Sequence, residues 1–179
     1  MTKLCKWIVS LFIAGSSLSA YSQTPVIGSA APDFNLRDQQ GVQRRVADFK
    51  GKWLVLYFYP KNDTPGCTTE ACSFRDGQAM INAMGAQVVV VSIDDSSSHA
   101  AFAAKHKLPF PLLADTDGAV AARYGALSDW KVMKFAKRHT FLIDPKGVVR
   151  KAYLDVDPDK HAAQVLADLR ALIDGTKPG

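Results

Sequence analysis

The sequence contains little cysteine, no apolar run long enough for a permanent membrane span and only a small excess of positive charge. Three cysteines among 179 residues are too few for a domain built on several disulfides. The most apolar stretch, from Trp7 to Ala14, is too short to cross a bilayer as a stable helix. Lysine and arginine number 22 against 17 acidic residues, and a formal net charge of +5 does not indicate nucleic-acid binding.

The chain also lacks an internal linker and an internal repeat. No segment rich in proline, glycine and serine divides it, and 47% of its residues are hydrophobic, which is enough for one core. We therefore expect a single domain over residues 23–179. Residues 1–22 are expected to be removed, and the remaining chain would carry 20 basic and 17 acidic residues, a net charge of +3.

The N-terminus has the pattern of an export signal. Lys3 and Lys6 precede the apolar stretch Trp7 to Ala14, small residues follow, and Ala20-Tyr21-Ser22 offers a cleavage site. We predict that residues 1–22 are a signal peptide and that the protein is exported to the periplasm. The alternative is an uncleaved signal that anchors the protein to the membrane.

Cys67 and Cys72 would then be the only cysteines of the mature chain, because Cys5 lies within the predicted signal. Five positions of ideal helix would separate the Cα atoms of Cys67 and Cys72 by about 8.7 Å. A disulfide requires about 4.4 to 6.8 Å. A bridge between them therefore needs local unwinding, and we interpret the pair as reactive rather than structural.

The residues before Cys67 predict a strand, a turn and the start of a helix. Trp53 to Tyr59 is a continuous apolar run typical of a strand buried on both faces, and Pro60 ends it. Thr64 suits the N-cap and Pro65 the first helical position. Cys67 then lies in the first helical turn, where backbone N–H groups and the helix dipole favour a thiolate, the nucleophilic form.

The rest of the chain predicts alternating strands and helices. Strands are expected at residues 87–93, 140–143 and 148–154, the last two as a hairpin, and helices at 67–84, 97–106, 119–124 and 158–173. Such alternation indicates a sheet with helices on both faces and reactive groups beyond the carboxyl ends of the strands.

A cluster of cations precedes the first strand of that hairpin. It consists of Lys131, Lys134, Lys137 and Arg138, and we predict a solvated loop rather than a phosphate-binding track.

The segment from Tyr57 to Asp76, YFYPKNDTPGCTTEACSFRD, resembles the active-site stretch of peroxiredoxins. It resembles in particular the atypical two-cysteine subfamily known as bacterioferritin comigratory protein or peroxiredoxin Q. The likeness continues from Val26 to Phe34 and from Arg138 to Asp144. It implies a thioredoxin-like α/β fold, with a central mixed sheet flanked by helices and an N-terminal β extension.

The resemblance also implies roles for five residues. Cys67 matches the cysteine that attacks the peroxide and Cys72 the resolving cysteine; Thr64 matches a hydroxyl that binds peroxide and sulfur, Pro60 a ring that shields the pocket, and Arg138 the guanidinium that holds the thiolate. The implied activity is a thiol-dependent peroxidase for hydrogen peroxide and organic hydroperoxides, with no metal and no organic cofactor. A thioredoxin-like dithiol would restore the enzyme, and we expect a monomer that binds no nucleic acid and no membrane after signal removal.

Two parts of the sequence leave questions open. Glu70, one turn beyond Cys67, fits a complement to the helix dipole, and its role stays undecided.

None of the four histidines pairs with a cysteine for acyl transfer, and two cysteines without nearby histidines do not make a zinc site. The segment from Leu127 to Lys137 lacks the glycine that relatives often carry after a lysine there, so substrate access and the oligomeric surface stay open.

Two other functions fit the same scaffold. A thiol–disulfide oxidoreductase is opposed by the Cys-x4-Cys spacing, because such enzymes use Cys-x-x-Cys. A redox-sensing adaptor would bind a partner only after oxidation and would react with peroxide no faster than ordinary cysteine does.

Overall fold

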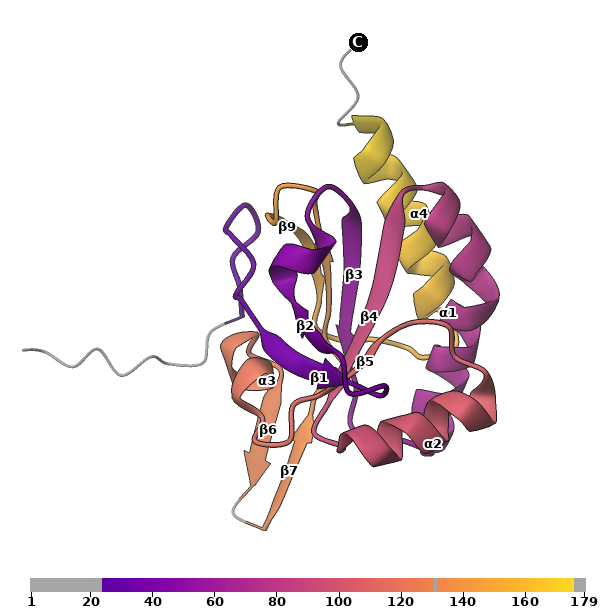
Figure 1. The fold of residues 1–179 in the computed structure, drawn as a ribbon. Coiled ribbons are helices and arrows are strands. Elements are labelled where there is room, and N and C mark those ends of the chain that lie inside the picture. Colours follow the sequence, from indigo (N-terminus) through magenta and orange to yellow (C-terminus); the bar gives the residue numbers. More distant parts are fainter. Residues whose placement is uncertain (1–23, 131, 176–179) are drawn as a thin grey trace, which may run out of the picture.

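The computed structural model describes residues 24–130 and 132–175, so the predicted signal segment lies outside the described residues. Seven strands form the central sheet in the order β2-β1-β5-β4-β3-β8-β9 (Figure 1). They are β1 (Asn35–Asp38), β2 (Gln43–Arg45), β3 (Trp53–Phe58), β4 (Ala86–Ser92), β5 (Leu112–Ala114), β8 (Thr140–Ile143) and β9 (Val149–Tyr153). Within the described ranges, no helix has the length and apolar character needed to cross a membrane.

The strands β3, β4 and β5 are parallel, and β1, β2, β8 and β9 run antiparallel to their neighbours, so the sheet is mixed, as predicted. All six residues of β3 are buried. Alternate residues belong to two separate cores, with Val55 and Tyr57 on one face and Leu54 and Leu56 on the other. A strand covered on both faces has no polar side to present, which explains its continuous apolar sequence.

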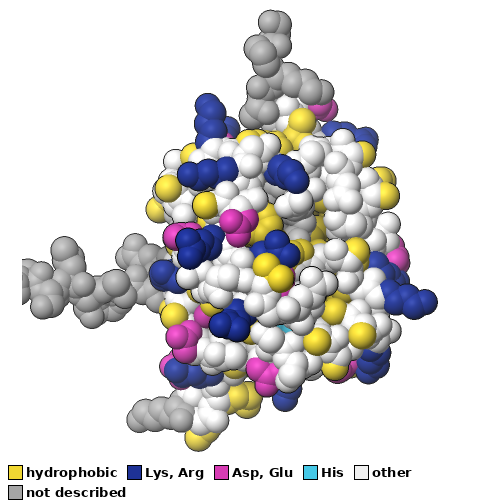
Figure 2. Space-filling model, viewed as in Figure 1, with side chains coloured by type: hydrophobic (Ala, Val, Ile, Leu, Met, Phe, Trp, Pro, Cys, Tyr) yellow, Lys and Arg dark blue, Asp and Glu magenta, His cyan; other side chains and the backbone are white. Residues whose placement is uncertain are grey.

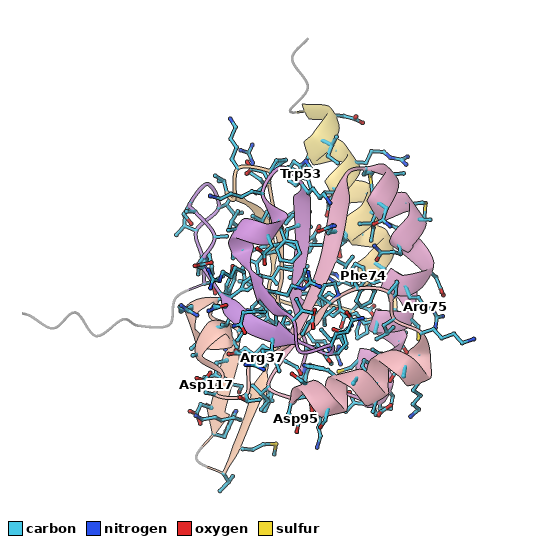
Figure 3. The ribbon with its side chains drawn as sticks, viewed as in Figure 1. Arg37, Trp53, Phe74, Arg75, Asp95 and Asp117 are labelled. Carbon is cyan, nitrogen blue, oxygen red and sulfur yellow. The ribbon has the colours of Figure 1, made fainter. Side chains whose placement is uncertain are left out.

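Helices cover both faces of the sheet (Figure 1). Helices α1 (Pro65–Ala83), α2 (Ser96–His106) and α4 (His161–Gly175) contribute to one core, and the 3-10 helix η1 (Val46–Phe49) and α3 (Ala119–Arg123) contribute to the other. Figure 3 shows how α1 divides its side chains: Phe74 lies on the inner side, fully buried, and Arg75 lies on the outer side.

The predicted helices are confirmed, with small shifts at their ends. Helix α1 has Thr64 at its N-cap and Pro65 at its start, although the Thr64 side chain makes no capping hydrogen bond. Helix α2 is capped by Asp95, whose carboxylate accepts from Ser98 N at 2.8 Å. Helix α4 begins at His161 rather than at residue 158, because a turn precedes it in which the Asp157 carbonyl accepts from the His161 backbone N–H.

The prediction of a solvated loop at the basic cluster holds only in part: Lys134 and Lys137 are exposed, but Lys134 lies in a strand. Strands β6 (Leu127–Trp130) and β7 (Met133–Ala136) form an antiparallel hairpin that projects beyond the central sheet (Figure 1). Ala136 at its base is fully buried in one of the cores, which anchors the hairpin. Lys134 pairs with Asp129 across the two strands at 3.5 Å, and Lys131 lies outside the described residues.

On the face of the molecule in Figure 2, lysine and arginine side chains are spread over the surface and form no single large patch.

Candidate active site

The pairing of β3 with β8 brings two distant segments to the same edge of the sheet. The two strands are antiparallel, with Tyr57 opposite Thr140, and Phe58 N donates to the His139 carbonyl at 2.8 Å. The residue before His139 is Arg138, and the loop after β3 leads directly into α1. The start of β8 therefore lies beside the start of α1.

Cys67 and Arg138 meet at this edge. Cys67 lies in the first turn of α1 and is 1% exposed. Arg138 Nη2 donates to Cys67 Sγ at 3.0 Å. The guanidinium and the N-terminal N–H groups of the helix both place positive charge at the sulfur, in a site from which most water is excluded. Arg138 is thus not the solvated residue that its position in a basic cluster suggested.

Glu70 shares the same guanidinium. Arg138 Nη1 donates to Glu70 Oε2 at 2.7 Å, and Glu70 is 1% exposed. Burial raises the pKa of Glu70 to about 7 even though the charge of Arg138 acts in the opposite direction. The sequence left the role of Glu70 open because its partner lies 68 residues away.

His161 lies behind Glu70, at the start of α4. Its ring is fully buried, with Nε2 at 2.9 Å from Thr140 Oγ1 and at 4.0 Å from Glu70 Oε1. Burial, with a smaller contribution from Arg138, lowers the pKa of His161 to about 4, so the ring is neutral near pH 7. No pattern in the sequence distinguished this histidine from the other three.

Gly66 leaves room for the guanidinium. A Cβ atom at this position would lie 3.0 Å from Arg138 Nη2 and 3.4 Å from Pro158 Cγ. The first contact is short enough to force a shift of the Arg138 side chain, whereas the second is an ordinary van der Waals distance. The glycine before Cys67 therefore permits the close approach of Arg138 to the start of α1.

Thr64 and Pro60 lie at the two ends of the loop that leads into α1. The Thr64 hydroxyl donates to the Lys61 carbonyl at 3.1 Å, and in the described part of the chain no hydrogen bond joins it to Cys67. Pro60 is half-buried and lines a cleft of about 480 Å³ between the carboxyl ends of β3 and β4 and strand β7. The structure therefore places both residues beside the start of α1, as the sequence predicted.

Asn62, which lies between Pro60 and Thr64, links this loop to α2 through hydrogen bonds. Its side chain is buried, accepts from the Tyr59 hydroxyl and donates to Ser98 Oγ at 2.8 Å. Its backbone N–H donates to the carboxylate of Asp94 at 2.9 Å.

The next residue, Asp63, has a positive φ of 58° and forms an ion pair with Lys105 at 2.8 Å. Neither Asn62 nor Asp63 has a role that could be read from local spacing, because Ser98 and Lys105 lie 36 and 42 residues further along the chain.

Cys72 is half-buried on the same helix as Cys67, and both cysteines are free thiols. Arg75 Nη1 lies 3.5 Å from Cys72 Sγ and donates to the His106 carbonyl at 2.8 Å. Helix α1 is continuous from Pro65 to Ala83, so the two cysteines keep helical spacing. The structure thus has the geometry of the reduced protein, in which a bridge requires unwinding.

A buried cysteine at a helix start, held by an arginine on a thioredoxin-like sheet, defines a class of thiol-dependent peroxidases. Such a site supplies a nucleophilic sulfur and fixed donors for the charge that forms when an O–O bond breaks.

Comparisons with known proteins agree with this class. Residues 27–152 match the family model described as AhpC/TSA family. The chain is 43% identical to chloroplastic peroxiredoxin Q of Triticum aestivum over 146 aligned residues. The alignment covers 81% of this chain and 67% of that protein. The crystal structure of peroxidoxin BcpB from Mycobacterium tuberculosis is 38% identical, with a TM-score of 0.77, covering 82% of this chain and 97% of that one. A mutant of peroxiredoxin Q from Xylella fastidiosa is 31% identical, with a TM-score of 0.79, covering 84% and 98%.

The chain belongs to the AhpC/TSA family, and it is a peroxiredoxin. The resemblance to the bacterioferritin comigratory protein and peroxiredoxin Q group is confirmed, as is the thioredoxin-like fold. The family membership also decides for a peroxidase over the thiol–disulfide oxidoreductase and the adaptor.

Proposed function

We propose that the protein reduces hydrogen peroxide and organic hydroperoxides through Cys67. The thiolate attacks the terminal peroxide oxygen, an S–O bond forms and the O–O bond breaks. The departing hydroxide or alkoxide takes up a proton and leaves as water or alcohol, and Cys67 becomes a sulfenic acid. The supporting observation is the 3.0 Å contact between Arg138 Nη2 and Cys67 Sγ, because a cation there favours both the thiolate and the charge on the departing oxygen.

Thr64 and Pro60 complete the proposed peroxide site. The Thr64 hydroxyl can turn from the Lys61 carbonyl toward a bound peroxide, since its bond at 3.1 Å is an exposed one. The Pro60 ring would limit access of water to the sulfur. Both roles are supported by the position of these residues at the two ends of the loop before α1.

Cys72 would then resolve the sulfenic acid. Its thiolate attacks the sulfur of oxidised Cys67, an S–S bond forms and the hydroxyl leaves as water after taking up a proton. Because about 8.7 Å separates the Cα atoms of residues five positions apart in an ideal helix, the first turns of α1 must unwind before this bond can form. The intramolecular disulfide makes a second subunit unnecessary, and we propose that the protein acts as a monomer.

A thioredoxin-like dithiol is the proposed reductant. Thiol–disulfide exchange would return both cysteines to thiols, with no metal and no organic cofactor. Organic hydroperoxides are included because a solved relative, the bacterioferritin comigratory protein of Xanthomonas campestris, is described by its alkyl peroxide reduction activity; it is 35% identical, with a TM-score of 0.75, covering 78% of this chain and 92% of that one.

Export to the periplasm remains a proposal that rests on the sequence of residues 1–22. In an oxidising compartment the disulfide would persist without a dedicated electron supply, so the donor would have to be an exported thioredoxin-like protein. Sequencing the N-terminus of the protein from periplasmic extract would test cleavage after Ser22; recovery of the uncleaved chain in membranes would support the anchored alternative.

The function is tested by peroxide consumption with thioredoxin, thioredoxin reductase and NADPH. The natural protein should turn over, Cys67→Ser should lose all turnover, and Cys72→Ser should reduce one equivalent of peroxide and then stop at the sulfenic acid. Mass spectrometry should show an intramolecular bridge between Cys67 and Cys72 in the natural protein, with amide exchange faster over residues 66–74. Unchanged turnover in Cys67→Ser would refute the proposed nucleophile, and a dimer linked through Cys72 would refute the intramolecular route.

A further inference from the structure

One half-buried cation, Arg138, contacts two buried acidic groups in this site. Arg138 donates through Nη2 to Cys67 Sγ at 3.0 Å and through Nη1 to Glu70 Oε2 at 2.7 Å. If Cys67 and Glu70 were both ionised, two negative charges would face one positive charge in a place that is almost closed to water. If Glu70 carried a proton, the thiolate and the guanidinium would balance each other.

We assign that proton to the second carboxyl oxygen of Glu70, Oε1. Glu70 Oε1 is buried and has no hydrogen-bond partner among the described residues. An ionised carboxylate would leave this oxygen as a buried, uncompensated acceptor, which is costly. Across the core, His161 Nε2 lies 4.0 Å from Glu70 Oε1, and that ring is neutral near pH 7 because burial lowers the pKa of His161 to about 4.

The other groups around Glu70 do not supply a further positive charge. Tyr57 on β3 is buried beside it, and the negative charge of Glu70 helps to raise the pKa of that phenol, so Tyr57 stays neutral. Cys67 lies on the same helix and brings a negative charge when it is ionised. Arg138 is therefore the one cation identified around Glu70 in the described part of the chain.

We propose that Glu70 holds a proton while Cys67 is a thiolate and releases it when Cys67 becomes a sulfenic acid. Oxidation removes the negative charge on sulfur, so Arg138 then needs a different anion, and the Glu70 carboxylate is already in contact with it. The burial that raises the pKa of Glu70 to about 7 agrees with a carboxyl that can change state near neutral pH.

The step balances in atoms and charge. The thiolate, the hydroperoxide and protonated Glu70 give the sulfenic acid, the alcohol or water, and the Glu70 carboxylate. Sulfur is oxidised by two electrons, the O–O bond is reduced by two, and the proton lost by Glu70 equals the proton that the departing oxygen takes up. Glu70 acts on the sulfur through Arg138, which makes it a positioning residue rather than a catalytic one. This inference rests on the proposed role of Cys67.

The sequence makes a direct test possible, because Glu70 is the only glutamate of the chain. Cell-free synthesis with glutamate labelled at the δ-carbon gives one carboxyl signal in a carbon NMR spectrum, so no assignment or mutation of Glu70 is needed. The protein used is Cys72→Ser, in which oxidation stops at the sulfenic acid. Spectra are recorded near pH 6.5, before and after one equivalent of hydrogen peroxide, with thiolate absorbance measured first.

The expected result is a protonated carboxyl in the reduced protein and a carboxylate after oxidation. Uptake of protons from a weakly buffered solution should then be well below one per Cys67 oxidised, and it should rise to about one in Cys72→Ser/Glu70→Gln. A signal that keeps the same protonation state while mass spectrometry shows an added oxygen on Cys67 would overturn the inference and leave the proposed function intact. A Cys67 that gains no oxygen would overturn both.

Discussion

Arg138 and Cys67 lie 71 residues apart in the chain, yet Nη2 of one is 3.0 Å from Sγ of the other. The contact follows from the antiparallel pairing of β3 with β8, which puts Thr140 opposite Tyr57 at the carboxyl end of β3. Arg138 lies just before β8 and Cys67 lies in the first turn of α1, so the paired strands and the helix that follows β3 fix both residues. A site held in this way can keep donors aimed at a developing charge without reorganising during the reaction.

Arg138→Lys should slow the reaction with peroxide by about 10²-fold. Lysine keeps the positive charge, but a single ammonium cannot bridge Cys67 and Glu70 as the forked guanidinium does. Stopped-flow measurement of sulfenic acid formation in the Cys72→Ser background would check this rate. Arg150→Lys is a matched control, because Arg150 is partly exposed and pairs loosely with Asp144 at 3.7 Å. Equal rates for the two variants would show that positive charge alone suffices.

Gly66→Ala should lower the peroxide rate because the added methyl group would stand 3.0 Å from Arg138 Nη2 and displace it from the sulfur. We expect a loss of about 10-fold or more, in line with a weakened donor. The thiolate absorbance of Cys67 should fall at the same pH.

Gly77→Ala provides the control for this change. It lies in the same helix, and its new methyl group would meet only the end of a flexible side chain, Leu166 Cδ1 at 3.3 Å. Alanine favours a helix over glycine by about 1 kcal/mol. The stability of Gly77→Ala should hold or rise and its peroxide rate should not change. A normal rate in Gly66→Ala would contradict the role of close approach at this position.

The fold could be predicted from the sequence where local patterns were strong. The apolar runs of β3 and β4 and the Thr64-Pro65 helix start gave these elements to within one or two residues. The hairpin of β6 and β7 could not be predicted, because its strands are short and carry exposed residues such as Trp130 and Met133. Its position depends on the burial of Ala136 in the core, which is a tertiary contact.

The residues of the site also fall into those that local sequence patterns predict and those that only tertiary contacts bring together. Cys67 and Thr64 were found from local signals, since the chemistry of a helix start can be read over a few residues. Arg138 was found only through resemblance to a family, because its contact with Cys67 depends on strand pairing. The contact of Glu70 with Arg138 and the position of His161 behind it were missed, since buried polar groups on different elements leave no periodic pattern in the chain.

Asn62→Ala should loosen the loop between Pro60 and Thr64. The Asn62 side chain accepts from the Tyr59 hydroxyl and donates to Ser98 Oγ at 2.8 Å, so its loss leaves the buried Tyr59 hydroxyl with the longer, 3.3 Å contact to His99 Nδ1. We expect the free energy of unfolding to fall by about 1–3 kcal/mol. Chemical denaturation would measure this, and the peroxide rate of the folded variant should also fall.

Asn82→Ala is the matched control for this loop variant. Asn82 is exposed and accepts from Gln78 on the outer side of α1 at 2.7 Å, so its removal should cost less than about 0.5 kcal/mol. If Asn62→Ala were as stable and as active as Asn82→Ala, the attachment of the loop to α2 would have no part in holding the site.

Glu70 and His161 should impose opposite pH dependences on stability. The folded-state pKa of Glu70 is raised to about 7, so its contribution to stability is present below its unfolded pKa near 4.5 and is lost as pH rises through 7. The folded-state pKa of His161 is lowered to about 4, so its neutral form favours the folded state above about pH 6.5, and that stability is lost as pH falls toward 4. Each change amounts to about 3 kcal/mol, and the two nearly cancel between pH 4.5 and 6.5.

Glu70→Gln should uncover this balance. Glutamine keeps the shape of the side chain but does not titrate. As the pH rises from 4.5 to 7.5, the free energy of unfolding of the variant should therefore rise by about 3 kcal/mol relative to that of the natural protein. As the pH falls from 6.5 to 4, the free energy of unfolding of His161→Gln should rise by a similar amount relative to that of the natural protein. Urea unfolding across this pH range measures both differences. At pH 7.5 the natural protein has to ionise a buried carboxyl and Glu70→Gln does not, so the variant should be the more stable protein. It also lacks the proton that we assign to the reduced site, so it should be the slower peroxidase. A variant that is no more stable at pH 7.5 would show that Glu70 is ionised without cost in the folded state.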